Sequence, residues 1–175
     1  MGICDNRVVI ITGAGGGLGA AHAKVFAAEG ASVIVNDINE DAAKKVVEEI
    51  TAAGGKAVVN TSDITNYDDS LNAVKQAIDT YGDLHIVLNN AGVNRDRMFA
   101  SMTEAEWDTI MAVHLKGHFC ITSHAVHYWR GKSKEGKAVD ARIINTTSGA
   151  GLQGSVGQSN YAAAKAGIAA LTLNQ

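Results

Sequence analysis

The stretch "RVVIITGAGGGLG", residues 7–19, decides the fold. It joins a short run of β-branched residues to a glycine-rich turn, and an alanine-rich segment follows directly. In such a turn Gly13 can take the tight bend, Gly17 lets backbone approach a phosphate, and Gly19 permits close helix packing. Free amides at the helix start supply hydrogen-bond donors for an anion. A glycine turn alone is a weak signal, but its place between a strand and a helix predicts a nucleotide-binding βαβ unit.

The same alternation continues along the chain. The runs are almost wholly apolar, which is typical of parallel strands buried on both faces by crossover helices. We therefore predict an α/β fold, a doubly wound (Rossmann) parallel sheet with helices on both faces, as a single domain over residues 1–175. The predicted strands are 7–12, 32–37, 56–60, 84–90 and 141–147, and the predicted helices are 18–29, 40–53, 67–80, 104–130 and a last one from 159.

Composition narrows the class of protein. The chain has 175 residues, of which 46% are hydrophobic and 19% charged, as in a globular domain with a sizeable core. A net charge of -3 without a long basic run argues against a nucleic-acid partner. The apolar start is too short to span a membrane and does not resemble a signal peptide. Only Cys4 and Cys120 are present, which favours a reducing compartment and predicts a cytoplasmic protein.

Small or polar residues end each predicted strand, and in such sheets ligands bind outside the carboxyl ends of the strands. Asp37 ends the second strand, 18 residues after Gly19, where a carboxylate can accept hydrogen bonds from ribose hydroxyls. A 2'-phosphate would face this negative charge without a nearby Arg or Lys, so NAD is favoured over NADP. Alternatively, Asp37 caps the helix that begins near Glu40.

Two further strand ends have open interpretations. Asp63, in "NTSDIT", could accept a hydrogen bond from an adenine amino group, or could cap the helix that starts near Tyr67. The segment "NNAG", residues 89–92, has minimal side chains that would let backbone lie against a flat ligand, although a plain turn would use similar residues.

"YAAAK" places Tyr161 and Lys165 four residues apart, so on a helix they share a face. A free phenol has a pKa of about 10, and a nearby ammonium favours the phenolate that an alcohol-oxidising base needs. Ser148 lies 13 residues before Tyr161, just past the fifth predicted strand, where its hydroxyl could stabilise charge on the reacting oxygen. The alternative is an exposed Tyr and a solvated Lys on an ordinary helix.

Together these motifs resemble the short-chain dehydrogenase/reductase family across nearly the whole chain. "TGAGGGLG" is similar to the family's TGxxxGxG, "NNAG" is a family motif, and Ser148 with "YAAAK" is similar to the catalytic Ser and YxxxK. The resemblance implies oxidation of a secondary alcohol to a ketone by hydride transfer to NAD. The catalytic residues expected are Ser148, Tyr161, Lys165 and His114, and the cofactor-binding residues expected are Gly13, Gly16, Gly17, Leu18, Gly19, Asp37, Asp63, Ile64, Asn90, Ala91, Gly92, Tyr161 and Lys165.

The resemblance also carries narrower expectations. "VHLKG", "VNRDRMF" and "GQSNYAAAK" are similar to the (3R)-hydroxyacyl-CoA dehydrogenase portion of peroxisomal multifunctional enzymes. This similarity favours a 3-hydroxyacyl-CoA as the substrate, and hydroxysteroids are the next choice. A homotetramer is implied, built partly through the helix at 104–130. The family continues for two more strands and a substrate lid, so we expect a fold truncated at its C-terminus.

Some residues differ from the motifs of the short-chain dehydrogenase/reductase family or are not part of them. The family has Asn where this chain has His114, and that Asn is thought to hold a water through its backbone carbonyl, which His could still offer. A non-catalytic NAD-binding sensor or interaction subunit is therefore the alternative function. His114, His118, His124 and His127 share one helical segment, and we expect polar packing and no metal site. Arg95 and Arg97 could meet an anionic substrate or form surface ion pairs.

Overall fold

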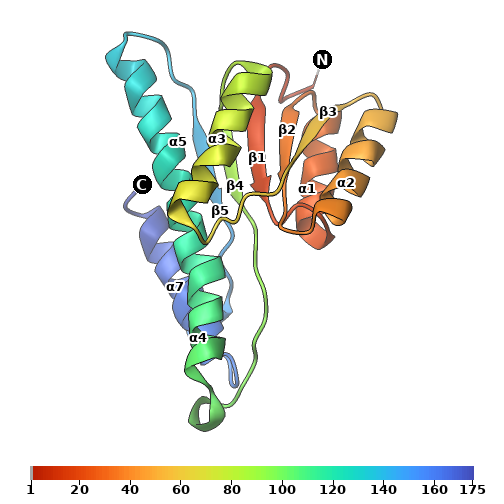
Figure 1. Cartoon of the computed structure of the whole chain (residues 1–175). Helices are drawn as coiled ribbons and strands as arrows, with labels where there is room; N and C mark the ends of the chain where they lie inside the picture. Colours follow the sequence, from red (N-terminus) through yellow and green to blue (C-terminus); the bar gives the residue numbers. More distant parts are fainter. Residues whose placement is uncertain (1) are drawn as a thin grey trace.

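The computed structural model describes residues 2–175 (Figure 1). Its centre is a five-stranded sheet in the order β3-β2-β1-β4-β5, in which every neighbouring pair is parallel. The doubly wound α/β prediction is thus confirmed. The strands are β1 Val8–Thr12, β2 Ser32–Asn36, β3 Lys56–Asn60, β4 Ile86–Asn89 and β5 Arg142–Asn145.

Helices cover both faces of the sheet (Figure 1). Alternate residues of β1 explain the two layers, because successive side chains of a strand point to opposite faces. Val9 and Ile11 pack with α1 and α2, whereas Val8 and Ile10 pack with α3 and α5. The helices are α1 Gly17–Ala28, α2 Glu40–Ala52, α3 Tyr67–Tyr81, α4 Glu104–Ile110, α5 Gly117–Lys134, α6 Ala150–Gln153 and α7 Ser159–Thr172, with a 3-10 turn η1 at Phe99–Ser101.

The predicted helix 104–130 needs correction. It is divided into α4 and α5 by a π-helical segment, η2, at Met111–Lys116, and α5 runs on to Lys134, past the predicted end at residue 130. π-helical segments are rare and often lie at functional sites. A capping box starts α4, in which Thr103 and Glu106 satisfy each other's backbone amides. In Figure 1, α4 and α7 lie side by side and extend beyond the carboxyl ends of the strands.

The sheet is not buried evenly. Every residue of β1 and β4 is buried, as predicted, but β5 exposes Arg142 and Ile144 because it is an edge strand of the sheet that residues 2–175 form. Predicted burial on both faces was therefore wrong for β5, and also for the other edge strand β3, of which only Asn60 is buried. Among the described residues no helix is long and apolar enough to cross a membrane.

Candidate active site

A crevice lies where the strand order reverses, at the carboxyl ends of β1 and β4. This is the topological switch point at which doubly wound sheets bind ligands. The crevice has a volume of about 440 Å³ and adjoins a smaller, more apolar pocket of about 140 Å³ that shares Gly13, Asp37 and Gly92 with it. The crevice is lined by Gly13, Gly16, Gly17, Leu18, Gly19, Asp37, Asn90, Gly92, Asn94, His114, Thr146, Tyr161 and Lys165.

The glycine turn between β1 and α1 has the backbone that its sequence requires. Gly13 and Gly17 have φ of 62° and 52°, in the left-handed region that favours glycine. A Cβ on Gly19 would lie 2.1 Å from the Gly13 carbonyl oxygen, whereas the space around Gly16 and Gly17 is open. Helix α1 starts without a side-chain cap or an acidic residue in its first turn. Its free amides can therefore donate hydrogen bonds to an anion in the crevice.

The side chain of Asp37 is hydrogen-bonded to this turn. Its Oδ2 accepts a hydrogen bond from the Gly15 amide at 2.9 Å, and its Oδ1 accepts from the Asn39 amide at 2.9 Å. The cap of α2 is Asn39, whose side chain accepts from the Ala42 amide, so Asp37 is not the helix cap. A Cβ on Gly15 would approach the Asp37 carboxylate to 2.8 Å. Gly15 is thus a functional glycine that the sequence reading missed.

Asp63 and Ile64 line the smaller pocket. The Asp63 Oδ1 accepts from the amide and the hydroxyl of Thr65, both at 2.8 Å, and α3 is capped by Asn66. The capping alternative for Asp63 is therefore wrong. Ile64 is buried and packs against Gly117, where a Cβ would lie 2.8 Å from its Cδ1. The pocket thus has an acidic rim and an apolar wall.

The "NNAG" segment is held to the glycine turn. The Asn90 amide group donates to the carbonyls of Thr12 and Gly13 at 3.0 and 3.3 Å, and the Thr12 hydroxyl accepts from the Asn90 and Ala91 amides, each at 3.0 Å. Thr12, missed by the sequence reading, thereby joins the ends of β1 and β4. A Cβ on Gly92 would lie 2.6 Å from the His114 ring, so this glycine makes room for a side chain of the site.

Tyr161 and Lys165 share one face of α7, as their spacing predicted. The Lys165 Nζ lies 5.5 Å from the centre of the Tyr161 ring and donates to the Thr146 carbonyl at 2.5 Å. Lys165 is buried, and burial lowers the pKa of its ammonium to about 8. Thr146 acts through its main chain, for which no side-chain pattern in the sequence could have been a signal.

The side chain of His114 lies at the crevice, whereas the sequence analysis expected a role only for its backbone carbonyl. It lies within η2, is buried, and meets Tyr161 edge to face with ring centres 5.2 Å apart. Its Nε2 lies 2.8 Å from the Val93 carbonyl oxygen and 3.1 Å from the Val93 amide nitrogen, so it donates to the carbonyl when it carries the proton and accepts from the amide when Nδ1 carries it. Burial lowers the pKa of His114, which favours the neutral ring. The His114 carbonyl accepts a hydrogen bond from the Gly117 amide.

Ser148 stands apart from this group. Its Oγ accepts a hydrogen bond from the Ala150 amide at 3.3 Å, at the start of α6. Within residues 2–175, Ser148 is not among the side chains that line the crevice. The structure therefore brings Tyr161, Lys165 and His114 together at the crevice and leaves Ser148 in the loop beside it.

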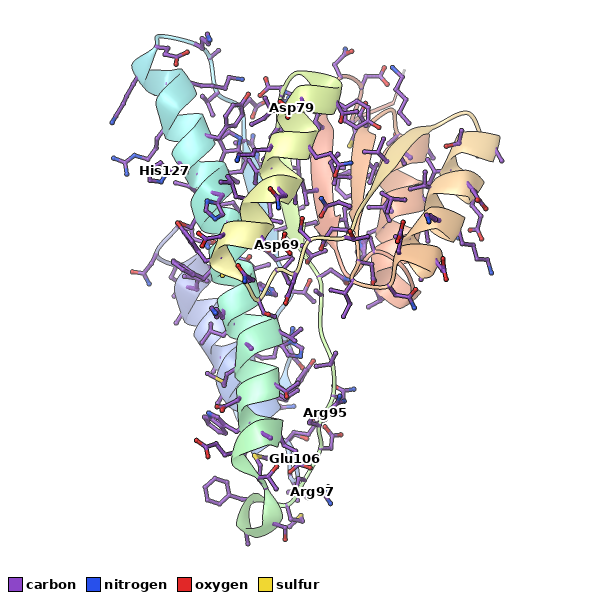
Figure 2. The ribbon with its side chains drawn as sticks, viewed as in Figure 1. Asp69, Asp79, Arg95, Arg97, Glu106 and His127 are labelled. Carbon is purple, nitrogen blue, oxygen red and sulfur yellow. The ribbon has the colours of Figure 1, made fainter. Side chains whose placement is uncertain are left out.

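Asn160, immediately before Tyr161, is completely buried and fully hydrogen-bonded. Its amide group donates to the carbonyls of Arg95 and Glu106 at 3.1 and 3.2 Å, and its Oδ1 accepts from the Tyr161 amide at 2.8 Å. Arg97 adds an ion pair to Glu106 at 2.8 Å, so of the two arginines it is Arg97 that forms the expected surface pair (Figure 2). The contacts of Asn160 therefore join α7 to α4 and to the segment that contains Arg95.

We expect Asn160→Ala to lower the free energy of unfolding by about 2 kcal/mol, because it removes a completely buried side chain together with its hydrogen bonds to the Arg95 and Glu106 carbonyls. The position of Tyr161 would loosen, and we expect turnover to fall about tenfold. Urea unfolding and steady-state kinetics measure the two effects. Asn174→Ala, at an exposed amide near the end of α7, is the matched control and should change neither. Equal behaviour of the two variants would show that Asn160 does not position the tyrosine.

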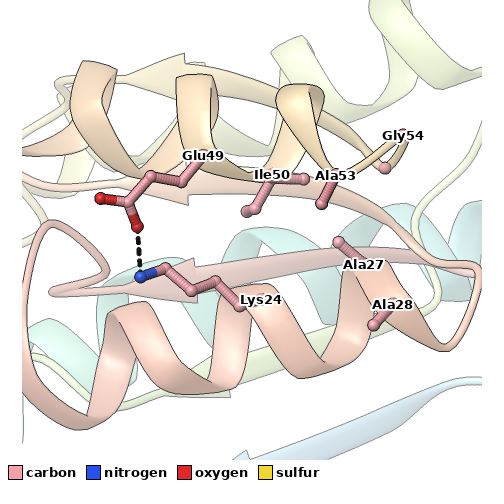
Figure 3. A pocket seen from close by; sticks show the side chains of 8 residues that line it. Lys24, Ala27, Ala28, Glu49, Ile50, Ala53 and Gly54 are labelled. Atoms are coloured by element: carbon pink, nitrogen blue, oxygen red, sulfur yellow. Dashed lines mark ion pairs between the residues drawn. The ribbon is translucent and has the colours of Figure 1, made fainter.

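A second groove lies between α1 and α2 (Figure 3). Lys24 and Glu49 form an ion pair across it, and its remaining lining consists of alanine, glycine and Ile50. It shares no residue with the crevice. We therefore assign it to helix packing.

The four histidines of the 104–130 region have different environments. His114 and His118 are buried, the Nε2 of His124 lies 2.7 Å from the Tyr67 carbonyl oxygen, and His127 is exposed on α5 (Figure 2). In the part of the chain that the structure describes, no three His, Cys, Asp or Glu side chains form a group that could hold a metal ion.

The fold and the crevice define a Rossmann-type domain with a Tyr–Lys pair at its switch point. The family model of the short chain dehydrogenases matches residues 7–174. The chain belongs to the short-chain dehydrogenase family.

Individual relatives agree with this assignment. The chain is 50% identical to the hydroxyacyl-CoA dehydrogenase ChsB1 of Mycobacterium tuberculosis, over 97% of this chain and 56% of that protein. It is 46% identical to the peroxisomal multifunctional enzyme type 2 of Mus musculus, over 95% of this chain and 23% of that protein. A crystal structure of a short chain dehydrogenase from Mycobacterium avium superposes with a TM-score of 0.97 at 59% identity, covering 99% of this chain and 63% of that one. The chain thus spans less than two thirds of the length of each of these relatives.

Proposed function

We propose that this chain is the catalytic core of an NAD-dependent oxidoreductase that interconverts a secondary alcohol and a ketone. The observation that carries the proposal is the meeting of Tyr161, Lys165 and His114 with the glycine turn around a single crevice. Neither a sensor nor a structural domain needs a buried lysine beside a tyrosine at that place. The relatives' dehydrogenase names support the same reaction class.

The residues present fit a dinucleotide. The open space at Gly16 and Gly17 beside the uncapped start of α1 suits a pyrophosphate. Asp37 stands where the two pockets meet and suits a ribose, and the pocket with Asp63 and Ile64 suits an adenine. Crevice volumes of this order fall in the range of ligand pockets, ~300–1,000 Å³. When bound, nicotinamide would supply the hydride acceptor.

The chain's own residues would then handle the proton. Tyr161 takes the hydroxyl proton of the alcohol as general base in oxidation and returns it as general acid in reduction. Lys165, an ammonium near neutral pH, stabilises the phenolate by its charge. The neutral His114 ring packs against Tyr161 and limits its orientation. We assign the stabilisation of the substrate oxygen to Ser148, which requires that its hydroxyl turn from the Ala150 amide toward the crevice.

The test is the formation of reduced nicotinamide by the full-length protein with 3-hydroxyacyl-CoAs, hydroxysteroids and simple secondary alcohols. Turnover with any of these classes supports the proposal, and the preferred class identifies the substrate. We favour a 3-hydroxyacyl-CoA, as the name of the M. tuberculosis relative suggests. NAD binding without turnover on the whole panel would favour the alternative, a non-catalytic NAD-binding sensor.

We expect NAD⁺ to bind more tightly than NADP⁺, and Asp37→Asn to shift the ratio of their dissociation constants at least about tenfold toward NADP⁺, or about 1.4 kcal/mol. The physical reason is that a carboxylate repels a 2'-phosphate, by up to ~4 kcal/mol at 4 Å near a protein surface. Fluorescence titration measures both constants. Asp41→Asn, at the exposed start of α2, is the control and should leave the ratio unchanged. Tighter NADP⁺ binding by the unaltered protein would refute the cofactor assignment.

Assembly and location belong to the same proposal. We propose a homotetramer that uses the surface of α4 and α5, where Trp107 and Phe119 are 36% and 49% exposed. Two cysteines, both free, support a cytoplasmic location, although several relatives are named as peroxisomal enzymes.

A further inference from the structure

The segment that joins β5 to α6 contacts Lys165 of α7 at three places. The Thr146 carbonyl accepts a hydrogen bond from the Lys165 Nζ at 2.5 Å, and the Thr147 hydroxyl donates to the main-chain carbonyl of Lys165 at 2.7 Å. The third contact is made by Gly151, whose surroundings leave no room for a side chain. Ser148 lies in the same segment, so its distance from Lys165 depends on how closely the segment approaches α7.

Gly151 packs directly against the main chain of α7. A Cβ on Gly151 would lie 2.6 Å from the Ala166 nitrogen, 2.7 Å from the Lys165 carbonyl carbon and 3.0 Å from the Lys165 Cβ. Carbon atoms in contact are normally about 3.5–4.0 Å apart, so a methyl group here would separate the two helices by roughly 1 Å. The atoms that it would meet are helix backbone and a Cβ, none of which can rotate away.

Gly151 is required by this close approach and not by its own backbone conformation. It lies inside α6, and its φ is not positive, unlike those of Gly154 and Gly157. Alanine is the better helix former at such a position. Glycine therefore weakens α6 intrinsically, and the contact with α7 is the physical reason for its presence.

Gly151 is firmly connected to Ser148. The Gly151 amide donates to the Ser148 carbonyl at 3.0 Å, and the Ser148 Oγ accepts from the Ala150 amide at 3.3 Å. The two residues therefore move together, as the first turn of α6. If the helices separate, α6 is the one that yields, because none of its four residues is buried, whereas α7 buries Lys165 and Ile168.

We propose that Gly151 is a positioning residue, which acts through Ser148 and sets the distance of the Ser148 hydroxyl from Tyr161 and Lys165. This inference rests on the proposed dehydrogenase reaction and on the role assigned there to Ser148. In that reaction the Ser148 hydroxyl stabilises the substrate oxygen, and Tyr161 exchanges its proton. A misplacement of about 1 Å between two such groups can lower the rate about 10²-fold. The missing Cβ at residue 151 is thus a requirement of the reaction as well as of the packing.

The experiment compares Gly151→Ala with Gly149→Ala in the full-length protein. We expect Gly151→Ala to lower kcat about 10²-fold. The dissociation constant of NAD⁺ should change less than about twofold, because α7 keeps Tyr161 and Lys165 in place. Gly149→Ala is the matched control, since a Cβ there would make an ordinary contact, 3.8 Å from the Gln153 Nε2, and it should leave both quantities unchanged. Equal kcat in the two variants, or loss of NAD⁺ binding by Gly151→Ala, overturns the proposal.

A double-mutant cycle separates positioning from a general loss of packing. Ser148→Ala should lower kcat about 10²–10³-fold, as removal of one donor to a developing oxyanion does. Because Gly151 acts through Ser148, adding Gly151→Ala to Ser148→Ala should lower kcat by less than about threefold more, whereas independent effects multiply. A further loss of about 10²-fold in the double variant would refute the proposal. Full activity of Ser148→Ala would refute it too.

A crystal structure of Gly151→Ala gives a readout that does not depend on turnover. With α7 superposed on the unaltered protein, Ser148 should be displaced by roughly 1 Å, and an unmoved Ser148 contradicts the inference. If the unaltered protein turns over no substrate, the dehydrogenase proposal fails, and the inference that rests on it fails too. If the unaltered protein is active and Gly151→Ala is equally active, only the inference about Gly151 fails.

Discussion

Tyr161→Phe is expected to reduce kcat about 10³-fold, within the ~10²–10⁴ that general acid–base catalysis contributes. The phenylalanine ring keeps the edge-to-face contact with His114 but has no group that can take or return a proton. Binding of NAD⁺ should weaken by less than about fivefold, as the loss of one hydrogen bond of ~1 kcal/mol implies. Steady-state kinetics and fluorescence titration measure the two quantities.

This variant also separates the two candidate functions. An oxidoreductase loses turnover and retains NAD⁺, whereas a sensor shows no turnover to lose. Tyr81→Phe is the control, because Tyr81 lies at the far end of α3 and packs against the core beneath the sheet. Retention of more than about a tenth of kcat by Tyr161→Phe would contradict the role of Tyr161 as acid and base.

Lys165→Met is expected to abolish measurable turnover and to raise the free energy of unfolding by about 2 kcal/mol at pH 7. The ammonium of Lys165 is buried, and a pKa of about 8 against the usual 10.5 corresponds to a penalty of about 3 kcal/mol for the charge. A methionine of similar length does not carry this penalty. Urea unfolding of the full-length protein measures the gain.

The pH dependence tests the physical cause of this gain. Because burial lowers the pKa, the unfolded chain binds more protons than the folded one between pH 8 and 10.5, and stability therefore rises with pH in that window. Lys165→Met should lack this contribution and have a flatter profile there. Lys116→Met, at an exposed lysine, should retain the rise and change stability by less than about 0.5 kcal/mol. Destabilisation by Lys165→Met at pH 7 would show that the burial penalty is not the dominant effect.

Local sequence was sufficient to predict the glycine turn and the shared helix face of Tyr161 and Lys165. Glycine at residues 13 and 17 is required by backbone conformations that other residues rarely adopt, and such requirements can be read from the chain. The i,i+4 spacing of Tyr161 and Lys165 is likewise local, since a helix places them on one face. The position of Asp37 at the end of the second strand was predicted from the sequence, although its hydrogen bond to the Gly15 amide was not.

Other features depend on long-range packing and escaped the sequence reading. The Asn160 contacts with Arg95 and Glu106 join segments more than 50 residues apart. The π-helical segment within the predicted helix 104–130 has no simple residue signal, and it places the His114 side chain against Tyr161. The exposure of β5 depends on which strand lies at the edge of the sheet.

The sequence by itself determined the α/β class, the glycine turn and the Tyr161–Lys165 pair, because hydrophobic periodicity, backbone conformation and helical spacing act over a few residues. Only the tertiary structure decided the lowered pKa of Lys165, the position of His114 and the burial of His118. These properties arise from the loss of solvent around groups that distant segments bring together, and desolvation is a property of the packed fold.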